Sequence, residues 1–222
     1  MEKLAKIREI LLAKEIIKKA GLYIVEKKDL ETLAEGAADA YQDYPLHNWL
    51  TKGKYDPKAS HLIMQISLKT MTEDAIIYAD SEEMNGFAAW LPFGFTGSKT
   101  LPFLFNGGLK LICHSGLSII GRLLTYENYA MNLKKEFTDN YDWYLYNLSI
   151  KKDAQGKGIA SKLMRPMLNF CDDERMVAYL ETNKESNVSL YNHYGFTLKK
   201  EEVIPKTTVT HYAMVRQPNQ TK

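Results

Sequence analysis

Two glycines in the segment Gln155-Gly-Lys-Gly-Ile-Ala160 lie where backbone N–H groups could bind an anion. The segment lies between a strand pattern that ends at Ile150 and a helical pattern that begins near Gly158. A strand that runs into a glycine-rich turn and then a helix exposes unpaired N–H groups at the positive end of the helix dipole. The segment therefore predicts an anion site that suits a pyrophosphate. Basic residues surround it: Lys151, Lys152, Lys157, Lys162 and Arg165.

Other interpretations of this glycine pair remain open at this point. A tight connection between a strand and a helix is the simplest one. A phosphate loop of the NTPase kind is excluded because Lys157 is followed by Gly158 instead of Ser or Thr. The dinucleotide pattern G-x-G-x-x-G is incomplete, since Ser161 stands in its final position.

Composition limits the kinds of protein this chain can be. The 222 residues are 45% hydrophobic and 25% charged, which predicts one globular domain over 1–222. The formal charge of +2 gives no global field for nucleic acid, so we expect no nucleic-acid partner. Cys113 and Cys171 form no C-x-x-C pair, which favours a reducing, cytoplasmic location and no metal.

The N-terminal segment 1–20 mixes apolar and basic residues in the pattern of an extra amphipathic helix. It has no uninterrupted apolar core of the kind a signal peptide needs. We expect it to pack on the body or on a second subunit, which leaves a homodimer open. Lys110, His114 and Arg122 interrupt the most apolar stretch, so no membrane partner is expected.

Strands and helices alternate along the rest of the chain, which predicts a mixed α/β sheet. The first half predicts a strand over Leu22–Glu26, a helix over Leu30–Tyr41, a break over Asp43–Trp49, a hairpin of Ala75–Ala79 with Gly86–Leu91, and a helical insert over 93–140. The second half predicts strands over Trp143–Ile150 and Val177–Glu181, helices over Gly158–Cys171 and Asn187–Tyr194, and a closing pair of Phe196–Val203 with Thr208–Arg216.

Two blocks of this pattern resemble the motifs of a known family. Leu148-Ser-Ile150 followed by Gln155-Gly-Lys-Gly-Ile-Ala-Ser-Lys-Leu-Met164 looks like motif A of the GNAT acetyltransferases. Leu180-Glu-Thr-Asn183 followed by Asn187-Val-Ser-Leu-Tyr-Asn-His-Tyr-Gly-Phe196 is similar to their motif B. Gly86–Pro92 and the ending Tyr212–Arg216 look most like the branch that contains puromycin N-acetyltransferase. Residues 1–40 match the family poorly.

The resemblance implies a GNAT-type acyl-CoA N-acyltransferase fold, with a splayed, mostly antiparallel central sheet flanked by helices. It also implies an acetyl-CoA-binding core over 143–196, in which the pantetheine arm lies where Trp143–Ile150 parts from Val177–Glu181. Acetyl-CoA is the expected cosubstrate. The residues that would hold it by this resemblance are Leu148, Ser149, Ile150, Gln155, Gly156, Lys157, Gly158, Ile159, Ala160, Ser161 and Asn187.

Acyl transfer to an amine needs a base, a donor to the oxyanion and an acid for the departing thiolate. The resemblance makes Tyr191 the candidate acid, although a tyrosine in an amphipathic helix is also a common core residue. Glu181 ends a predicted strand and is the candidate base, with a structural carboxylate as the alternative. His193, His211 and ordered water compete for the same role. The oxyanion donor is expected to be a backbone N–H near Leu148.

The expected function is transfer of an acetyl group from acetyl-CoA to a primary amine by direct attack in a ternary complex. Resemblance to the puromycin branch tilts the acceptor towards a small molecule, with a peptide amine as the other option. Acceptor selection should come from the less family-like parts, including Tyr44–Trp49, Trp90–Gly94 and the insert over 93–140. The alternatives are a non-catalytic acyl-CoA sensor or assembly module, and transfer to a hydroxyl or a protein lysine.

Overall fold

The computed structural model describes residues 2–92, 100–138 and 142–219. Its sheet has seven strands in the order β1-β2-β3-β4-β5-β7-β6, and β4 with β5 is the parallel pair while the other neighbours are antiparallel. The strands are β1 (Tyr23–Ile24), β2 (Ile76–Ala79), β3 (Gly86–Leu91), β4 (Asp142–Ile150), β5 (Val177–Thr182), β6 (Thr197–Val203) and β7 (Thr210–Arg216).

Helices precede, separate and follow these strands. In the first part of the chain they are α1 (Glu2–Lys19), α2 (Leu30–Ala40), α3 (Pro45–Leu50) and α4 (Pro57–Met71), with a 3₁₀ turn η1 (Lys27–Asp29) ahead of α2. The middle of the chain contributes α5 (Thr100–Phe103), the π-helical turn η2 (Leu104–Gly108), α6 (Leu109–Ser115) and α7 (Ser118–Phe137). A 3₁₀ turn η3 (Lys152–Ala154), α8 (Ile159–Asp173) and α9 (Ser186–His193) complete the set among the described residues.

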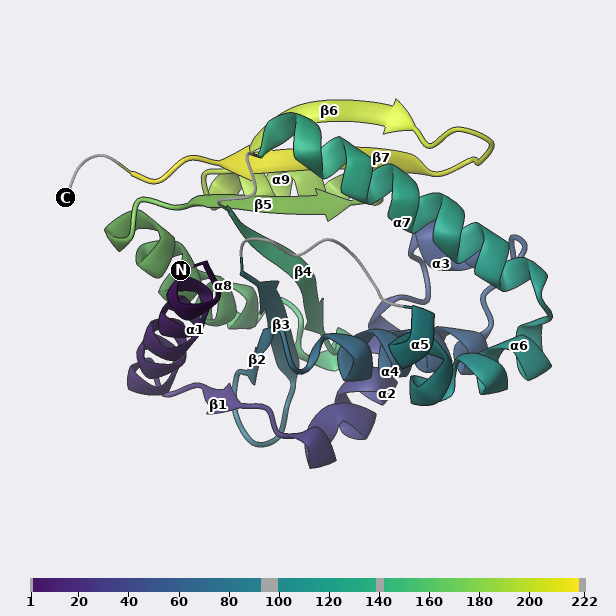
Figure 1. Cartoon of the computed structure of the whole chain (residues 1–222), viewed down its shortest axis with the longest axis horizontal. Helices are drawn as coiled ribbons and strands as arrows, with labels where there is room; N and C mark the ends of the chain where they lie inside the picture. Colours follow the sequence, from purple (N-terminus) through teal and green to yellow (C-terminus); the bar gives the residue numbers. More distant parts are fainter. Residues whose placement is uncertain (1, 93–99, 139–141, 220–222) are drawn as a thin grey trace.

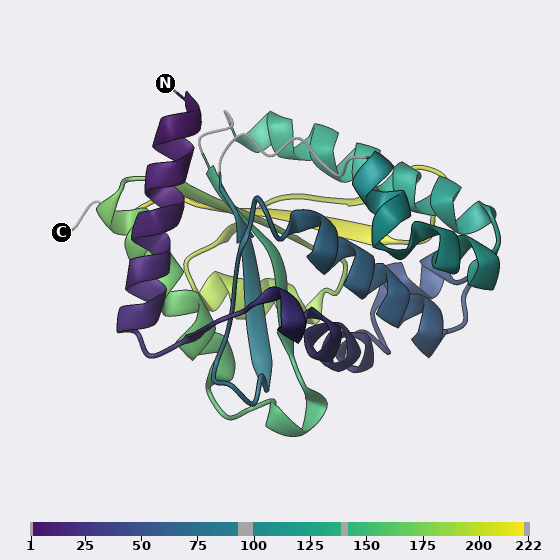
Figure 2. The same ribbon diagram turned by 60° about the horizontal axis from the view of Figure 1, so that its bottom comes forward.

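The sheet is covered on both faces, and each face has its own core. On one face α1 and α8 pack together, and Ile17, Leu163 and Phe170 bury against Trp143. On the other face α2 and α4 pack together, and residues such as Leu68 bury against the sheet. Figures 1 and 2 show α1 and α8 on one side of the central strands and the remaining large helices on the other. Apolar burial on both faces fixes the strands that carry the site.

A third core joins the middle helices to the end of the chain. Leu50 of α3, Ile63 of α4, Leu111 of α6 and Ile119 of α7 pack with Val209 of the β6–β7 turn. The expected helical insert is thus an outer layer beside the sheet, and Figure 1 shows α7 running along β6 and β7. Residues 93–99 and 139–140 of the expected insert lie outside the described residues.

Most expected elements are present, with three corrections. Asp43–Trp49 does not simply break the pattern, because Pro45 is preset for the first turn of a helix and α3 begins there. The helix α4 is missing from the expectation, although Asp56 caps it by accepting a hydrogen bond from the Ala59 amide at 3.0 Å. The strand expected over Leu22–Glu26 shortens to β1, which lies at the edge of the described sheet and pairs there with β2.

The N-terminal helix packs on the body through Ala13 and Ile17, which are both fully buried. Leu11 on its outer side is 59% exposed. Among the helices that the structure describes, none combines the length and apolarity needed to span a membrane.

Candidate active site

The central feature of the site is the separation of β4 from β5. The two strands pair from Asp142↔Val177 to Leu145↔Leu180 and no further. Beyond this point β4 stays paired with β3 as far as Ile150, while β5 stays paired with β7. Figure 1 shows β4 turning away from β5. Among the described residues, no strand pairs with this edge of β4 over Tyr146–Ile150, as the expected splayed sheet requires.

A β-bulge marks the same point on the opposite edge of β4. Ala89 of β3 pairs with Asn147 and Trp90 pairs with Leu145, so Tyr146 is an extra residue. The bulge interrupts the side-chain alternation. Tyr146 and Tyr144 belong to the α2–α4 face, and the Asn147 amide also reaches that face to donate to Tyr41 Oη at 3.0 Å. Two consecutive polar side chains of β4 thus lie on one side.

The glycine turn has the backbone geometry that an anion site needs. Gly156 and Gly158 have φ angles of +76° and +78°, a region that other residues enter at a cost. A Cβ built on either glycine meets no atom within 4 Å, so both face open space. In the described structure, the N–H groups from Gly156 to Ser161 make no hydrogen bond. The helix α8 begins at Ile159, within this run, and points its positive end at this space.

The basic side chains around the turn divide into two groups. Lys151 and Lys162 donate to the backbone oxygens of Glu83 at 3.2 Å and Asp80 at 2.6 Å, which fastens the turn to the β2–β3 hairpin. Lys152 binds Gln42. Lys157 is exposed, and it has no hydrogen bond or ion pair to any residue that the structure describes.

A cavity of about 590 Å³, here called the loop cavity, lies between the glycine turn, β4, β5 and α9. It brings together residues that are far apart in the sequence. Of the expected site residues, those that line it are Leu148, Ser149, Ile150, Gln155, Gly156, Gly158, Ile159, Ala160, Ser161, Glu181, Asn187 and Tyr191. Lys157 is outside this lining. A cavity of this size is typical of a cofactor site.

Glu181 is a buried carboxylate at the inner end of the loop cavity. Its side chain is 2% exposed, and burial raises its pKa to about 7, opposed by the neighbouring hydroxyls of Tyr179, Tyr144 and Tyr126. The Tyr126 hydroxyl donates to Oε2 at 3.5 Å. Oε1 has no hydrogen-bond partner among the described residues. A carboxylate with this pKa exchanges protons near neutral pH, which a general base requires.

The two histidines that compete with Glu181 are in different surroundings. His211 Nε2 lies 3.8 Å from Glu181 Oε2, but burial lowers the pKa of His211 to about 4. It is therefore neutral and weakly basic at neutral pH. His193 is exposed and is not part of the cavity lining.

Tyr191 of α9 faces the loop cavity while its ring packs on Phe196, with ring centroids 6.0 Å apart. Burial raises its pKa above the ordinary value, so the hydroxyl keeps its proton at neutral pH. Asn187, one turn earlier on α9, donates to Thr182 Oγ1 at 3.0 Å. Tyr44 also contacts Thr182 Oγ1, at 3.2 Å, and accepts from the Asn183 amide. This network holds α9 against the end of β5.

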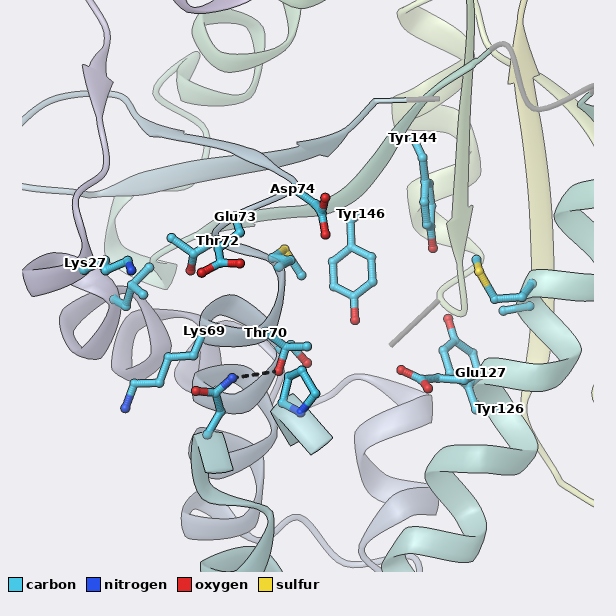
Figure 3. A pocket seen from close by; sticks show the side chains of 17 residues that line it. Lys27, Lys69, Thr70, Thr72, Glu73, Asp74, Tyr126, Glu127, Tyr144 and Tyr146 are labelled. Atoms are coloured by element: carbon cyan, nitrogen blue, oxygen red, sulfur yellow. Dashed lines mark hydrogen bonds between the residues drawn. The ribbon is translucent and has the colours of Figure 1, made fainter. Parts of the chain in front are cut away.

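A second cavity of about 460 Å³, here called the helix cavity, adjoins the loop cavity. It is bordered by α4, α7 and β4 (Figure 3). Five residues line both cavities and therefore stand between them: Ser67, Tyr126, Glu127, Tyr144 and Tyr146. Figure 3 shows the Tyr146 ring projecting into the space, with Tyr126 and Glu127 reaching toward it from α7.

Sequence analysis missed the residues of this boundary. Tyr126 and Glu127 belong to the helical insert over 93–140, which was expected to select the acceptor, but neither residue was singled out for that role. The neighbouring Tyr144 and Tyr146 were expected only as parts of a strand. Tyr144 and Tyr146 are two residues apart, and this spacing indicates that both side chains lie on one face of a strand.

Comparison with known proteins agrees with this geometry. Residues 121–198 match the model of the GNAT acetyltransferase domain, a stretch that runs from α7 through the glycine turn to the start of β6. Over this stretch the chain is similar to a GNAT acetyltransferase domain, and the protein is an acyltransferase. An uncharacterized N-acetyltransferase of Schizosaccharomyces pombe is 25% identical over 215 residues, covering 87% of this chain and 82% of that protein.

Solved structures share the fold at low sequence identity. An acetyltransferase of Corynebacterium glutamicum, described as histone acetyltransferase HPA2 and related acetyltransferase, has a TM-score of 0.59 and 16% identity over 90% of this chain and 97% of its own. Arylalkylamine N-acetyltransferase 2 of Aedes aegypti has a TM-score of 0.57 and 21% identity over 89% and 98%. The C-terminal condensation domain of Ebony, in complex with β-alanyl-dopamine, has a TM-score of 0.59 and 9% identity over 88% and 97%.

Proposed function

We propose that this protein transfers an acetyl group from acetyl-CoA to a primary amine of a small molecule, by direct attack in a ternary complex. One observation carries the proposal. The loop cavity has free backbone N–H groups at one end and the buried Glu181 carboxylate at the other, with the open edge of β4 between them.

The loop cavity suits acetyl-CoA in three respects. The N–H groups from Gly156 to Ser161, at the start of α8, would hold the pyrophosphate, with Lys157 adding charge from outside. The free edge of β4 over Leu148–Ile150 would pair with the amides of the pantetheine arm, as an added strand does. Asn187 and Tyr191 would contact the arm near its sulfur. When bound, acetyl-CoA supplies a thioester carbonyl to the centre between the two cavities.

Each proton of the transfer has a candidate partner in the chain. A C–N bond forms while the C–S bond breaks, and the amine gives up one proton to Glu181 as the departing thiolate accepts one from Tyr191. Exchange with solvent then restores both side chains. The raised pKa of Tyr191 keeps its proton available, and a thiolate in the same dry surroundings becomes more basic as well. A backbone N–H of β4 near Leu148 would stabilise the oxyanion.

Similar proteins support an amine acceptor. The Aedes aegypti neighbour is named for arylalkylamines, and the Ebony domain holds a dopamine derivative. The motif resemblance to the puromycin N-acetyltransferase branch favours a small molecule over a protein lysine. Tyrosines 126, 144 and 146 beside the transfer centre provide the surface that an apolar or aromatic amine would contact.

The test is acetylation of a panel of small primary amines, followed by CoA thiol release and by the mass of the product. Glu181→Gln keeps the shape but removes the base, and should lower kcat/KM by about 10²- to 10⁴-fold. Glu201→Gln, an exposed position on β6, is the matched control and should behave as wild type. Equal activity of the two variants would contradict the role of Glu181. Binding of acetyl-CoA without transfer to any amine would favour a non-catalytic sensor.

A further inference from the structure

The inner wall of the helix cavity differs chemically from its outer end. Glu127, Tyr126, Tyr144 and Tyr146 form the inner wall, next to the proposed transfer centre. Lys27, Lys69, Glu73 and Asp74 also line this cavity, and Figure 3 shows Lys27, Lys69 and Glu73 on the side opposite Glu127, so the charges there are of both signs. An acceptor in this cavity would therefore meet a carboxylate and tyrosine rings at the end where its nitrogen reacts.

Glu127 has no partner for its charge within the described structure. No hydrogen bond or ion pair joins it to any of those residues. Its pKa is raised from the ordinary value, and burial is the cause. A half-buried carboxylate is costly unless a cation or hydrogen-bond donor compensates it. Among the described residues nothing compensates Glu127, so a cation bound in the helix cavity would be stabilised beside it.

A second carboxylate reinforces this charge pattern. Glu127 and Glu181 both act electrostatically on Tyr146; Glu127 lines both cavities, and Glu181 lines the adjoining loop cavity. The basic residue that influences Glu181 is Lys134, which already binds Asp142 at 2.8 Å. A carboxylate carried next to the reacting nitrogen of a substrate would face these acids and be repelled. A cation would gain from them and from the negative faces of the tyrosine rings.

We propose that the acceptor is a cationic primary amine with an aromatic or apolar body and no carboxylate beside its nitrogen, and that Glu127 binds its ammonium group on entry. The inference rests on the proposed function and narrows it to one substrate class. Glu127 acts here in recognition. The bound ammonium loses one proton to solvent to become the nucleophilic amine, and Glu181 takes the second proton as the C–N bond forms.

The experiment compares 2-phenylethylamine with phenylalanine, which differ by one carboxylate next to the nitrogen. CoA thiol release gives kcat and KM for wild type, Glu127→Gln and the matched control Glu136→Gln, an exposed position on the same helix. In wild type, kcat/KM for 2-phenylethylamine should exceed that for phenylalanine by about 100-fold. Glu127→Gln should raise KM for 2-phenylethylamine about tenfold or more at unchanged kcat, and narrow the gap between the two compounds. Glu136→Gln should change neither.

Each other outcome overturns the inference in a recognisable way. Equal use of the two compounds, acetylation of neither, or an unchanged KM in Glu127→Gln would exclude the recognition role. A fall in kcat at unchanged KM, with loss of the acidic limb of the pH profile, would make Glu127 the base instead. Acetyl-CoA stabilisation of the folded protein is measured in parallel. If acetyl-CoA does not stabilise the wild-type protein, the proposed function itself is wrong. If it does stabilise the protein and one of these outcomes is found, only the proposed substrate class is wrong.

Discussion

The loop cavity and the helix cavity meet at one centre but are built in different ways. The loop cavity uses backbone groups, held by two glycines at positive φ and by the start of α8. The helix cavity uses side chains from α4, α7 and the bulged part of β4. Backbone groups suit a ligand part that is the same for every reaction, whereas side chains can change with the acceptor. The difference separates what is general in this protein from what is particular to it.

The largest predicted effect on activity is the pH dependence of acetyl transfer, which tests whether Glu181 in the loop cavity is the base. Glu181 must be ionised to act as base, and its pKa is raised to about 7, so activity should rise with pH through this value. At pH 5, two units below that pKa, kcat should be about 100-fold under its plateau. His211 stays neutral above about pH 4, and the surrounding tyrosines stay protonated.

The control for this profile is Glu181→Gln, which should lose the limb near pH 7 and retain only the ionisation of the amine itself. A profile of the same shape in this variant would assign the limb to another group. Glu127 is the next candidate, because its pKa is also raised by burial.

A smaller effect is expected from Tyr191→Phe. The hydroxyl makes no hydrogen bond to the residues that the structure describes, so the variant should fold without a lost internal contact. We expect kcat to fall roughly 30-fold, at the low end for an acid, because a thiolate is already a good leaving group. Acetyl-CoA affinity should stay the same. An unchanged kcat would leave Tyr191 as a packing residue on Phe196.

The smallest predicted effect tests whether the backbone of the glycine turn binds the phosphates of acetyl-CoA. Gly158→Ala places a methyl group in the open space at φ +78°, and Gly116→Ala does the same between α6 and α7, away from both cavities. Gly158→Ala should lose about 1 kcal/mol of stability, and Gly116→Ala somewhat more, because its ψ of 168° lies outside the left-handed helical region. Gly158→Ala should in addition weaken acetyl-CoA binding about tenfold. Equal affinities in the two variants would contradict a phosphate site at this turn.

The sequence predicted the loop cavity better than the helix cavity for a physical reason. Glycines at a strand-to-helix turn are required by local backbone geometry, so Gly156 and Gly158 can be recognised from their neighbours alone. The strands expected over Trp143–Ile150 and Val177–Glu181 are likewise present as β4 and β5. The bulge at Tyr146 depends on pairing with β3, and no local pattern marks it.

The helix cavity depends on how distant elements come together. Glu127 reaches the centre because α7 packs on α3 and on β7, which are far away in sequence. The helix α4 could have been recognised from Asp56 and Pro57, which together form a cap and a first turn. Its position beside α7 could not, since the third core that joins them is a tertiary property.

The central claim is that the loop cavity binds acetyl-CoA, and a thermal-unfolding titration tests it most directly. Adenosine diphosphate serves as the control for binding that needs only a pyrophosphate. At about 100 times the dissociation constant, acetyl-CoA should stabilise the folded protein by roughly 2.7 kcal/mol, which corresponds to a shift of several degrees. A saturable shift that is larger for acetyl-CoA than for the control is the predicted result. A folded protein whose melting temperature does not respond to acetyl-CoA would contradict the account.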